Sequence, residues 1–360
     1  MDKIKILMVI GSLDYCNGIT SYAMNYYQNM NHDLFSIDFA VHYNFDSDYK
    51  KQIEQDGNHV YFMGDYSLKS MLGLGKRIDN LLTANAYDII HCHILNVSYF
   101  YFKSAKKHGI SCRILHSHAS KNSDNPVKNI RNSFLKKLGL KYTTVRFACS
   151  KLAGDYLFKE PYEVIRNAID YNKFLYSREY AREIKEKYRI EDELVLGFIG
   201  RFTAQKNIPF LLKVFSGLKQ INFKFKAFII GDGSLRPMIE EYLQNHHLSN
   251  EVYLVDSTPE VYKYYSAFDI MLLPSLFEGL PVTGVEAQAA GCSVLCSSAI
   301  TEELNFSGLC RFLEIEDTEA WIECIRSFSK PENRTPAGFD YDIKTQTEVL
   351  EKKYIALVRG

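Results

Sequence analysis

The sequence predicts an α/β protein with two doubly wound, Rossmann-like parallel sheets, one in each of two domains that face a cleft. The first observation is the length of 360 residues, which exceeds the usual size of one domain. The second is a series of short apolar runs, each followed by a longer segment of helical periodicity, and this series occurs twice. The third is the charge balance, which differs between the two parts of the chain. Residues 1–165 hold 20 basic and 15 acidic residues, whereas the remainder holds 23 basic and 28 acidic residues.

The apolar runs are rich in Ile, Val and Phe, as expected for buried parallel strands. The strands expected in the first series are Ile4–Ile10, Ser36–Val41, His59–Met63, Asp88–Cys92, Cys112–His116 and Val145–Cys149. Those expected in the second series are Leu194–Ile199, Phe225–Ile230, Val252–Val255, Ile270–Leu273 and Ser293–Cys296.

The domain junction is expected between the two series. Residues Pro161–Phe174 predict a last short strand and a turn, and a charged helix follows over Arg178–Tyr188. We therefore expect domains at 1–165 and 166–335. The apolar spacing within Tyr341–Leu357 predicts a closing helix that completes the first domain.

Overall composition excludes several functional classes. The 43 basic and 43 acidic residues leave no net charge, so no nucleic-acid partner is expected. The eight cysteines lack the spacing of a structural zinc site and are expected to be reduced core residues. The apolar run before Gly11 is too short for a signal-peptide core, and no run approaches the roughly 18 residues that span a bilayer. The expected compartment is the cytoplasm.

The most informative stretch runs from Leu273 to Gly291. A strand ends near Leu273, a loop carries Glu278, and Pro281 lies where a helix can begin. Glu286 then lies about one turn into that helix. A helix N-terminus suits a phosphate and carboxylates suit hydroxyl groups, so this stretch predicts a nucleotide-sugar site.

A second loop of the same domain carries positive charge. Arg201 and Lys206 follow the strand that ends near Ile199, and a guanidinium and an ammonium at this spacing can close on one diphosphate. After the next strand, Gly231-Asp-Gly233 permits close approach of the backbone to a ligand.

Four histidines follow two neighbouring strands of the first domain. His118 comes just after its strand, with His116 as the alternative for a residue that faces a ligand. His91 and His93 form a similar pair, for which buried or structural roles are favoured, although side chains two apart on a strand share a face and a metal pair also fits.

These segments resemble the retaining GT-B-fold glycosyltransferases of group 1, especially bacterial enzymes of capsular and exopolysaccharide synthesis. The resemblance covers essentially the whole chain and is carried by Glu278-x7-Glu286, Gly200-Arg201-x4-Lys206, the Gly-Asp-Gly turn and the segment Val164–Asp170. It implies a metal-independent transfer of sugar from a nucleotide-sugar, expected to be a UDP-sugar, to a glycan or lipid-linked glycan acceptor, without a cofactor.

The resemblance also implies a role for each site residue. Glu278 and His118 would face the transferred sugar, Glu286 would hold the ribose hydroxyls, and Arg201 and Lys206 would neutralise the diphosphate. The remaining expected donor-binding residues are Gly11, Gly18, Gly200, Gly231, Gly279, Leu280 and Pro281. Two alternatives stay open: a non-hydrolysing sugar-nucleotide 2-epimerase, and a non-catalytic partner subunit of the same fold.

A basic segment predicts contact with an anionic membrane surface. Residues 125–142 place apolar side chains at helical spacing among five Lys and Arg residues, without an acid between Asp124 and Asp155. Either this stripe faces the core of its own domain, or the basic face rests on the inner leaflet of the plasma membrane. The second arrangement would suit an enzyme that elongates a lipid-linked acceptor.

Overall fold

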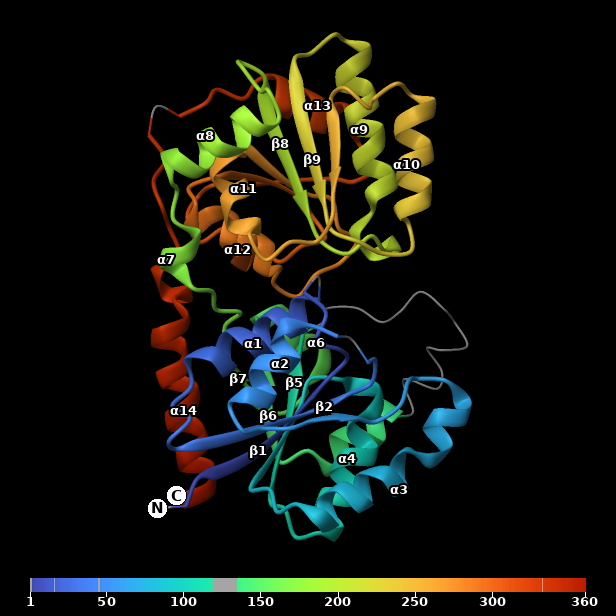
Figure 1. Ribbon diagram of the computed structural model, residues 1–360, viewed down its shortest axis with the longest axis vertical. Helices are drawn as coiled ribbons and strands as arrows, with labels where there is room; N and C mark the ends of the chain where they lie inside the picture. Colours follow the sequence, from blue (N-terminus) through green and yellow to red (C-terminus); the bar gives the residue numbers. More distant parts are fainter. Residues whose placement is uncertain (1, 16, 45, 119–134, 332) are drawn as a thin grey trace. The chain divides into compact units, whose positions relative to one another are not determined.

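The chain folds as two compact units in the computed structural model (Figure 1). Unit 1 comprises Met1–Ala168 and Ile343–Gly360, and unit 2 comprises Ile169–Asp342. The residues that the structure describes are 2–15, 17–44, 46–118, 135–331 and 333–360.

Unit 1 contains a seven-stranded parallel sheet within its described residues, in the order β3-β2-β1-β4-β5-β6-β7. The strands are β1 (Ile4–Ile10), β2 (Phe35–Val41), β3 (Val60–Phe62), β4 (Ile89–Cys92), β5 (Cys112–Ser117), β6 (Val145–Ala148) and β7 (Glu163–Val164). The helices include α1 (Gly18–Asn29), α2 (Asp48–Gln55), α3 (Leu68–Ala84), α4 (Leu95–Lys107), α6 (Lys151–Leu157) and α14 (Ile343–Arg359).

Strand β1 is apolar throughout its buried length because both of its faces are covered. Ile6 and Met8 belong to a core that also holds residues of α1 and α14. Leu7 and Val9 point to the opposite face, into a core with residues of α3 and α4. Successive strand residues point to opposite faces, so a strand between two helical layers needs apolar residues at every position.

The last helix of the chain returns to unit 1. Leu350 and Tyr354 of α14 are fully buried in the core beneath α1. The Arg359 guanidinium donates a 3.0 Å hydrogen bond to the carbonyl of Asp2, so the two ends of the chain lie side by side. The apolar spacing that predicted a closing helix thus reflects packing against the first strands.

Unit 2 contains a six-stranded parallel sheet within its described residues, in the order β10-β9-β8-β11-β12-β13. Its strands are β8 (Leu194–Ile199), β9 (Phe225–Ile230), β10 (Val252–Val255), β11 (Ile270–Leu273), β12 (Ser293–Ser297) and β13 (Cys310–Leu313). Its helices are α7 (Tyr171–Phe174), α8 (Arg178–Lys187), α9 (Ile208–Gln220), α10 (Arg236–Asn245), α11 (Val261–Ala267), α12 (Val282–Ala289) and α13 (Thr318–Arg326), with short 3₁₀ turns at Ala204–Lys206, Glu302–Leu304 and Phe339–Tyr341.

The predicted fold class is confirmed, since each unit is a parallel α/β sheet with helices on both faces. In both sheets the chain starts in the middle, proceeds to one edge, and returns to fill the other side. This reversal lies between β1 and β4 in unit 1 and between β8 and β11 in unit 2. Ligands of such sheets bind beyond the carboxyl ends of the strands at that point.

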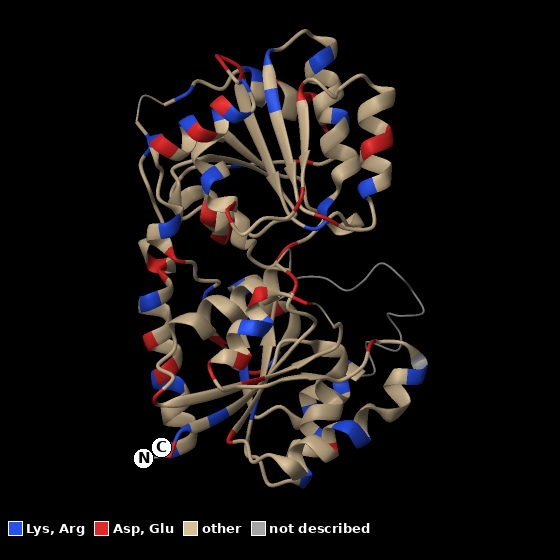
Figure 2. Ribbon diagram, viewed as in Figure 1, with Lys and Arg blue, Asp and Glu red and all other residues tan. Residues whose placement is uncertain are grey.

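Charged residues are interspersed over the helices and loops of both units (Figure 2). The basic segment of the sequence is described only from residue 135, and the residues 135–142 are helical. Lys136 in this helix lies 4.5 Å over the ring of Tyr156, so it packs on its own unit, whereas Lys137 and Lys141 are exposed. The predicted membrane-facing residues up to Phe134 lie outside the described part of the chain.

Among the cysteines that the structure describes, those at positions 92, 112, 149, 292, 296 and 310 are buried. In the part of the chain that the structure describes, no helix combines the length and the apolar character that crossing a membrane requires.

Candidate functional site

The two loops singled out in the second half of the sequence follow adjacent strands of unit 2. Strands β8 and β11 pair directly, with Ile270 opposite Leu196. The residues 200–207 follow β8 and the residues 274–281 follow β11. Because parallel strands end at the same edge of the sheet, both loops lie at the reversal point of this sheet.

Main-chain and side-chain hydrogen bonds join the two loops. The amide of Leu276 donates to the carbonyl of Gln205 at 2.8 Å. The side-chain amide of Gln205 donates back to the carbonyl of Phe277 at 2.9 Å. Gln205 therefore holds the two loops in register, and the sequence offered no motif that singled it out.

Lys206 and Glu278 form an ion pair across these loops. The Lys206 Nζ lies 2.5 Å from Oε1 of Glu278, and the side chains are only 17% and 13% exposed. The hydroxyl of Ser275 donates to the same carboxylate oxygen at 3.0 Å. A largely buried pair of this kind fixes the position of both charged groups.

Arg201 supplies a second cation in the same loop. Its side chain is exposed and makes no ion pair with a residue that the structure describes. The neighbouring Phe202 is fully buried, and its amide donates to the carbonyl of Asp232 at 2.8 Å. The backbone at Arg201 is thus anchored while its guanidinium remains available to an anion.

Gly231 lets a third loop pack against the first. Its φ angle is 147°, and a Cβ atom added there would lie 2.0 Å from the carbonyl oxygen of Gly200. The amide of Gly200 in turn donates to the carbonyl of Ile230 at 3.0 Å. In the structure, Gly231 therefore allows its own loop to approach the loop that carries Arg201.

We expect Gly231→Ala to lower the free energy of unfolding by about 1–3 kcal/mol, because it combines a strained backbone with a clash against main chain. Gly308→Ala is the matched control, since Gly308 also has a positive φ but has open space around its Cβ position. Chemical denaturation of both variants should show the larger loss for Gly231→Ala, because its φ of 147° is also less accessible to alanine than the 78° of Gly308. Equal losses in the two variants would show that the contact with Gly200 has no energetic importance.

Helix α12 directs its N-terminus to the end of β11. Pro281 occupies the N-cap position, and its side chain has no oxygen to accept a hydrogen bond from the first-turn amides. The preceding Gly279 and Leu280 are buried. This terminus has the partial positive charge that favours an anion.

Glu286 lies one turn into α12 and is only 9% exposed. The hydroxyl of Tyr265, on α11, donates a 2.6 Å hydrogen bond to its Oε2. Burial raises the pKa of Glu286 to about 7, although the Tyr265 hydrogen bond and the charge of Lys173 act in the opposite direction. Sequence reasoning missed Tyr265, which carries no signal that separates it from its neighbouring tyrosines.

Gly11 and Gly18 lie in the loop after β1 of unit 1. The carbonyl of Gly11 accepts hydrogen bonds from the amides of His42 and Tyr43, at 2.9 and 2.8 Å. Gly18 begins α1, whose N-cap Asn17 accepts from the amide of Ile19 at 3.0 Å. A Cβ atom would meet nothing within 4 Å at Gly18 and only ordinary contacts at Gly11, so packing within unit 1 does not require either glycine.

Four histidines of unit 1, His91, His93, His116 and His118, form one cluster at the ends of β4 and β5. Nε2 of His91 lies 3.1 Å from Nδ1 of His116, and Nδ1 of His93 lies 2.8 Å from Nε2 of His118. The ring of Tyr22 packs edge-on against His116 and His118. His118 is half-buried and His116 is buried, so His118 is the more accessible of the two candidates.

Burial keeps these imidazoles uncharged. It lowers the pKa of His91 and of His118 to about 3, and it lowers the pKa values of His93 and His116 well below the usual range. The four rings are therefore neutral at physiological pH, and each offers one nitrogen lone pair.

Comparison with known proteins shows which family the second unit is similar to. The residues 181–328 match the family described as "Glycosyl transferases group 1". EpsF of Bacillus subtilis (strain 168), which is named as a glycosyltransferase, is 28% identical over 89% of this chain and 86% of its own length. An Escherichia coli protein named UDP-Gal:alpha-D-GlcNAc-diphosphoundecaprenol alpha-1,3-galactosyltransferase is 24% identical over 72% of this chain and 69% of its own.

A solved structure of similar fold spans both units. Anabaena Alr3699/HepE, in complex with UDP-glucose, matches with a TM-score of 0.77 at 15% identity, over 99% of this chain and 97% of that one. At this identity the likeness establishes the fold, which is the GT-B type expected from the sequence. The paired loops of unit 2, with Arg201, Lys206 and Glu278, lie within residues 181–328, the part of the chain that is similar to the group 1 glycosyltransferases.

Proposed function

We propose that this protein is a retaining glycosyltransferase that moves a sugar from a UDP-sugar to a lipid-linked glycan during polysaccharide synthesis. The observation that carries the proposal is the pair of joined loops at the reversal point of the unit 2 sheet. There an exposed Arg201 and the Lys206–Glu278 ion pair follow adjacent strands.

The diphosphate is the part of the donor that this site suits best. When the bond between sugar and phosphate breaks, negative charge grows on the departing nucleoside diphosphate. Arg201 and Lys206 are the cations that would meet this charge, and the N-terminus of α12 would add its partial positive charge. These groups perform the role that a divalent cation has at other diphosphate sites, so the transfer step needs no metal at the diphosphate.

The carboxylates and a histidine would contact the hydroxyl groups of the donor. Glu278 is held by Lys206 and Ser275, and we assign it to the transferred sugar. Glu286 would accept hydrogen bonds from the ribose hydroxyls when its carboxyl is ionised. His118 would face the sugar, as in the retaining enzymes that the chain resembles, and retention of the anomeric configuration is proposed on the same resemblance.

The comparisons support the choice of donor and acceptor. The Anabaena structure is a complex with UDP-glucose, and the name of the Escherichia coli relative gives UDP-Gal as donor and a diphosphoundecaprenol-linked sugar as acceptor. A lipid-linked acceptor lies at a membrane surface, where the exposed Lys137 and Lys141 would favour anionic lipid. We therefore also propose a peripheral position on the inner face of the plasma membrane.

A panel of nucleotide-sugars tests the proposal through protein stability. A UDP-sugar at 100 times its dissociation constant is expected to raise the free energy of unfolding by about 2.7 kcal/mol, because it binds only the folded state. Uridine is the control, since it lacks the diphosphate. Stabilisation by uridine and UDP-sugars alike, or by none of the nucleotide-sugars, would contradict the assignment.

Product analysis with the stabilising donor then separates transfer from epimerisation. A glycosyltransferase extends a diphosphate-linked lipid acceptor and releases UDP, with the configuration at the sugar's anomeric carbon unchanged. An epimeric nucleotide-sugar formed from donor alone would contradict transfer.

A further inference from the structure

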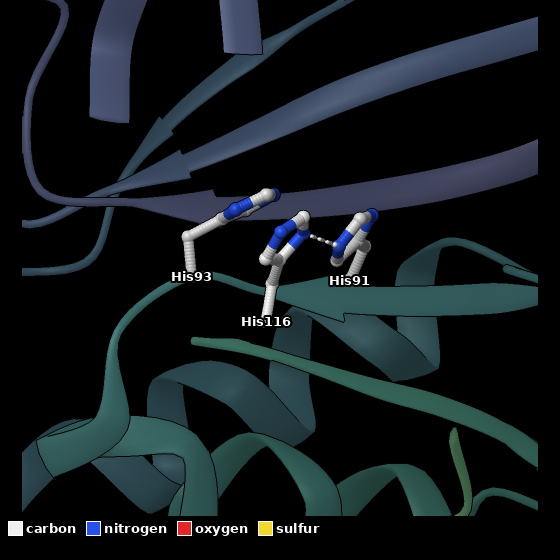
Figure 3. Close-up of side chains that lie close together, drawn as sticks. All are labelled: His91, His93 and His116. Carbon is white, nitrogen blue, oxygen red and sulfur yellow. Dashed lines mark hydrogen bonds between the residues drawn. The ribbon is translucent and has the colours of Figure 1, made fainter. Parts of the chain in front are cut away.

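The buried histidine cluster of unit 1 has a geometry that donor binding does not explain. His91 lies on β4 and His93 directly follows that strand, whereas His116 lies on β5 and His118 directly follows it. Strands β4 and β5 pair in parallel with His91 opposite Ile114, a register that brings His93 level with His116. Four imidazoles consequently lie at the carboxyl ends of neighbouring strands. Figure 3 shows the rings of three of them, His91, His93 and His116.

Two ring nitrogens of this cluster are buried without a hydrogen-bond partner among the described residues. They are Nε2 of His93 and Nε2 of His116, and the two side chains belong to residues that are 4% and 2% exposed. A buried polar atom left unpaired costs about 1–3 kcal/mol. A metal ion that accepts the lone pair of His93 Nε2 would remove the cost at that nitrogen.

We propose that His91, His93 and His116 form a binding site for a divalent transition-metal ion of the Zn²⁺ class. One nitrogen from each of these three residues lies within 4.8 Å of the nitrogens of the other two. The site lies in unit 1 and does not depend on the proposed glycosyl transfer.

The spacing of the ligand atoms is close to that of a coordination sphere. A tetrahedral zinc ion bound at about 2.1 Å separates its donor atoms by about 3.4 Å. Nε2 of His91 and Nδ1 of His116 are already 3.1 Å apart. A nitrogen of His93 lies within 4.8 Å of the other two ligand atoms, so ring rotations that move it by up to about 1.4 Å complete a three-imidazole set, which leaves a fourth position for water.

Hydrogen bonds to residues outside the proposed ligand set already orient two of the three ligands. Nδ1 of His91 lies 2.6 Å from the hydroxyl of the buried Tyr354, so this nitrogen can donate its proton while Nε2 binds the ion. Nδ1 of His93 is similarly paired with His118. Histidines that bind metals almost always donate their other N–H in this manner, which fixes the tautomer and the ring orientation.

The donor set also selects the metal. The three ligands are neutral imidazoles, which suit Zn²⁺, Co²⁺, Ni²⁺ and Cu²⁺, whereas Mg²⁺ and Ca²⁺ prefer carboxylate and carbonyl oxygens. The proposed ion is therefore chemically distinct from the divalent cations that accompany diphosphates.

Zinc binding to the full-length protein tests the inference. Protein stripped with chelator and dialysed against Zn²⁺ is expected to retain one equivalent. His91→Gln and His116→Gln should weaken binding by more than about 100-fold, whereas Tyr354→Phe, which removes only the outer partner, should weaken it by about 10-fold. His246→Gln is the control, because His246 is exposed and lies in unit 2.

X-ray absorption at the zinc edge measures the ligands of zinc bound to the protein without substitutions. This measurement tests the inference even if a variant misfolds. The expected spectrum has three imidazole nitrogens at about 2.0–2.1 Å. Absence of bound zinc, ligation by carboxylate oxygens, or unchanged binding by folded His91→Gln and His116→Gln would overturn the metal site. UDP binding measured on the same samples reports separately on the proposed function, because it depends on unit 2.

Discussion

Lys206→Ala is expected to lower the kcat/KM of sugar transfer by about 100-fold to 1,000-fold. The ammonium group is placed to meet charge that develops on the diphosphate only as the glycosidic bond breaks, and loss of one such donor typically has this effect. Arg201→Ala is expected to lower the kcat/KM of sugar transfer by about 10-fold to 1,000-fold for the same reason. Lys213→Ala is the matched control, because Lys213 is an exposed lysine on α9 of the same unit.

A second substitution separates this catalytic effect from a loss of stability. Lys206→Ala alone leaves the Glu278 carboxylate largely buried without its cation, and this costs folding free energy. The double variant Lys206→Ala with Glu278→Gln removes both charges, so it should recover stability but not activity. Normal turnover by Arg201→Ala with Lys206→Ala would refute the assignment of these two cations.

Glu286 is expected to make the stability of the protein depend on pH between about 4.5 and 7. Its carboxyl has a pKa of about 7 in the folded protein, because burial disfavours the charge, against the ordinary value of 4.5. Below pH 4.5 the group is protonated in both states and its full contribution to stability is present. As pH rises, the unfolded state loses its proton first, so about 3 kcal/mol of stability is lost by the time pH passes the folded pKa.

Denaturation of the protein and of Glu286→Gln at several pH values measures this contribution. The difference between the two unfolding free energies should change by about 3 kcal/mol between pH 4.5 and pH 7.5, and should stay constant above that range. Parallel curves for the two proteins would show that the Glu286 carboxyl is not held in a medium of low polarity. Tyr265→Phe, which removes the hydrogen bond, should raise the pKa of Glu286 further.

Most strands could be predicted because each is an apolar run that is buried on both faces. Strands β1, β8, β9, β10 and β11 have the bounds that their apolar runs predicted. Strand β13 (Cys310–Leu313) was missed, since it is a four-residue strand at the end of its sheet and carries an exposed Arg311. Such a short, half-polar run has no periodicity that distinguishes it from a loop.

Only those parts of the site whose residues are close together in the sequence could be predicted. Glu278 and Glu286 share one loop and helix, so their spacing was informative before the fold was known. The partner of Glu286 is Tyr265, on another helix, and the partner of His91 is Tyr354, which is 263 residues away. Contacts of this length depend on how helices are wound around the sheet, and no local pattern encodes them.

In the proposed function, the loops after β8 and β11 hold the diphosphate of a nucleotide donor. Amide hydrogen exchange with and without UDP measures this directly, because bound phosphate oxygens protect the amides that they contact. We expect slowed exchange over the residues 200–206 and 279–286, and we expect Lys206→Ala to reduce this protection. Protection confined to unit 1, with unchanged exchange in both loops of unit 2, would contradict the claim.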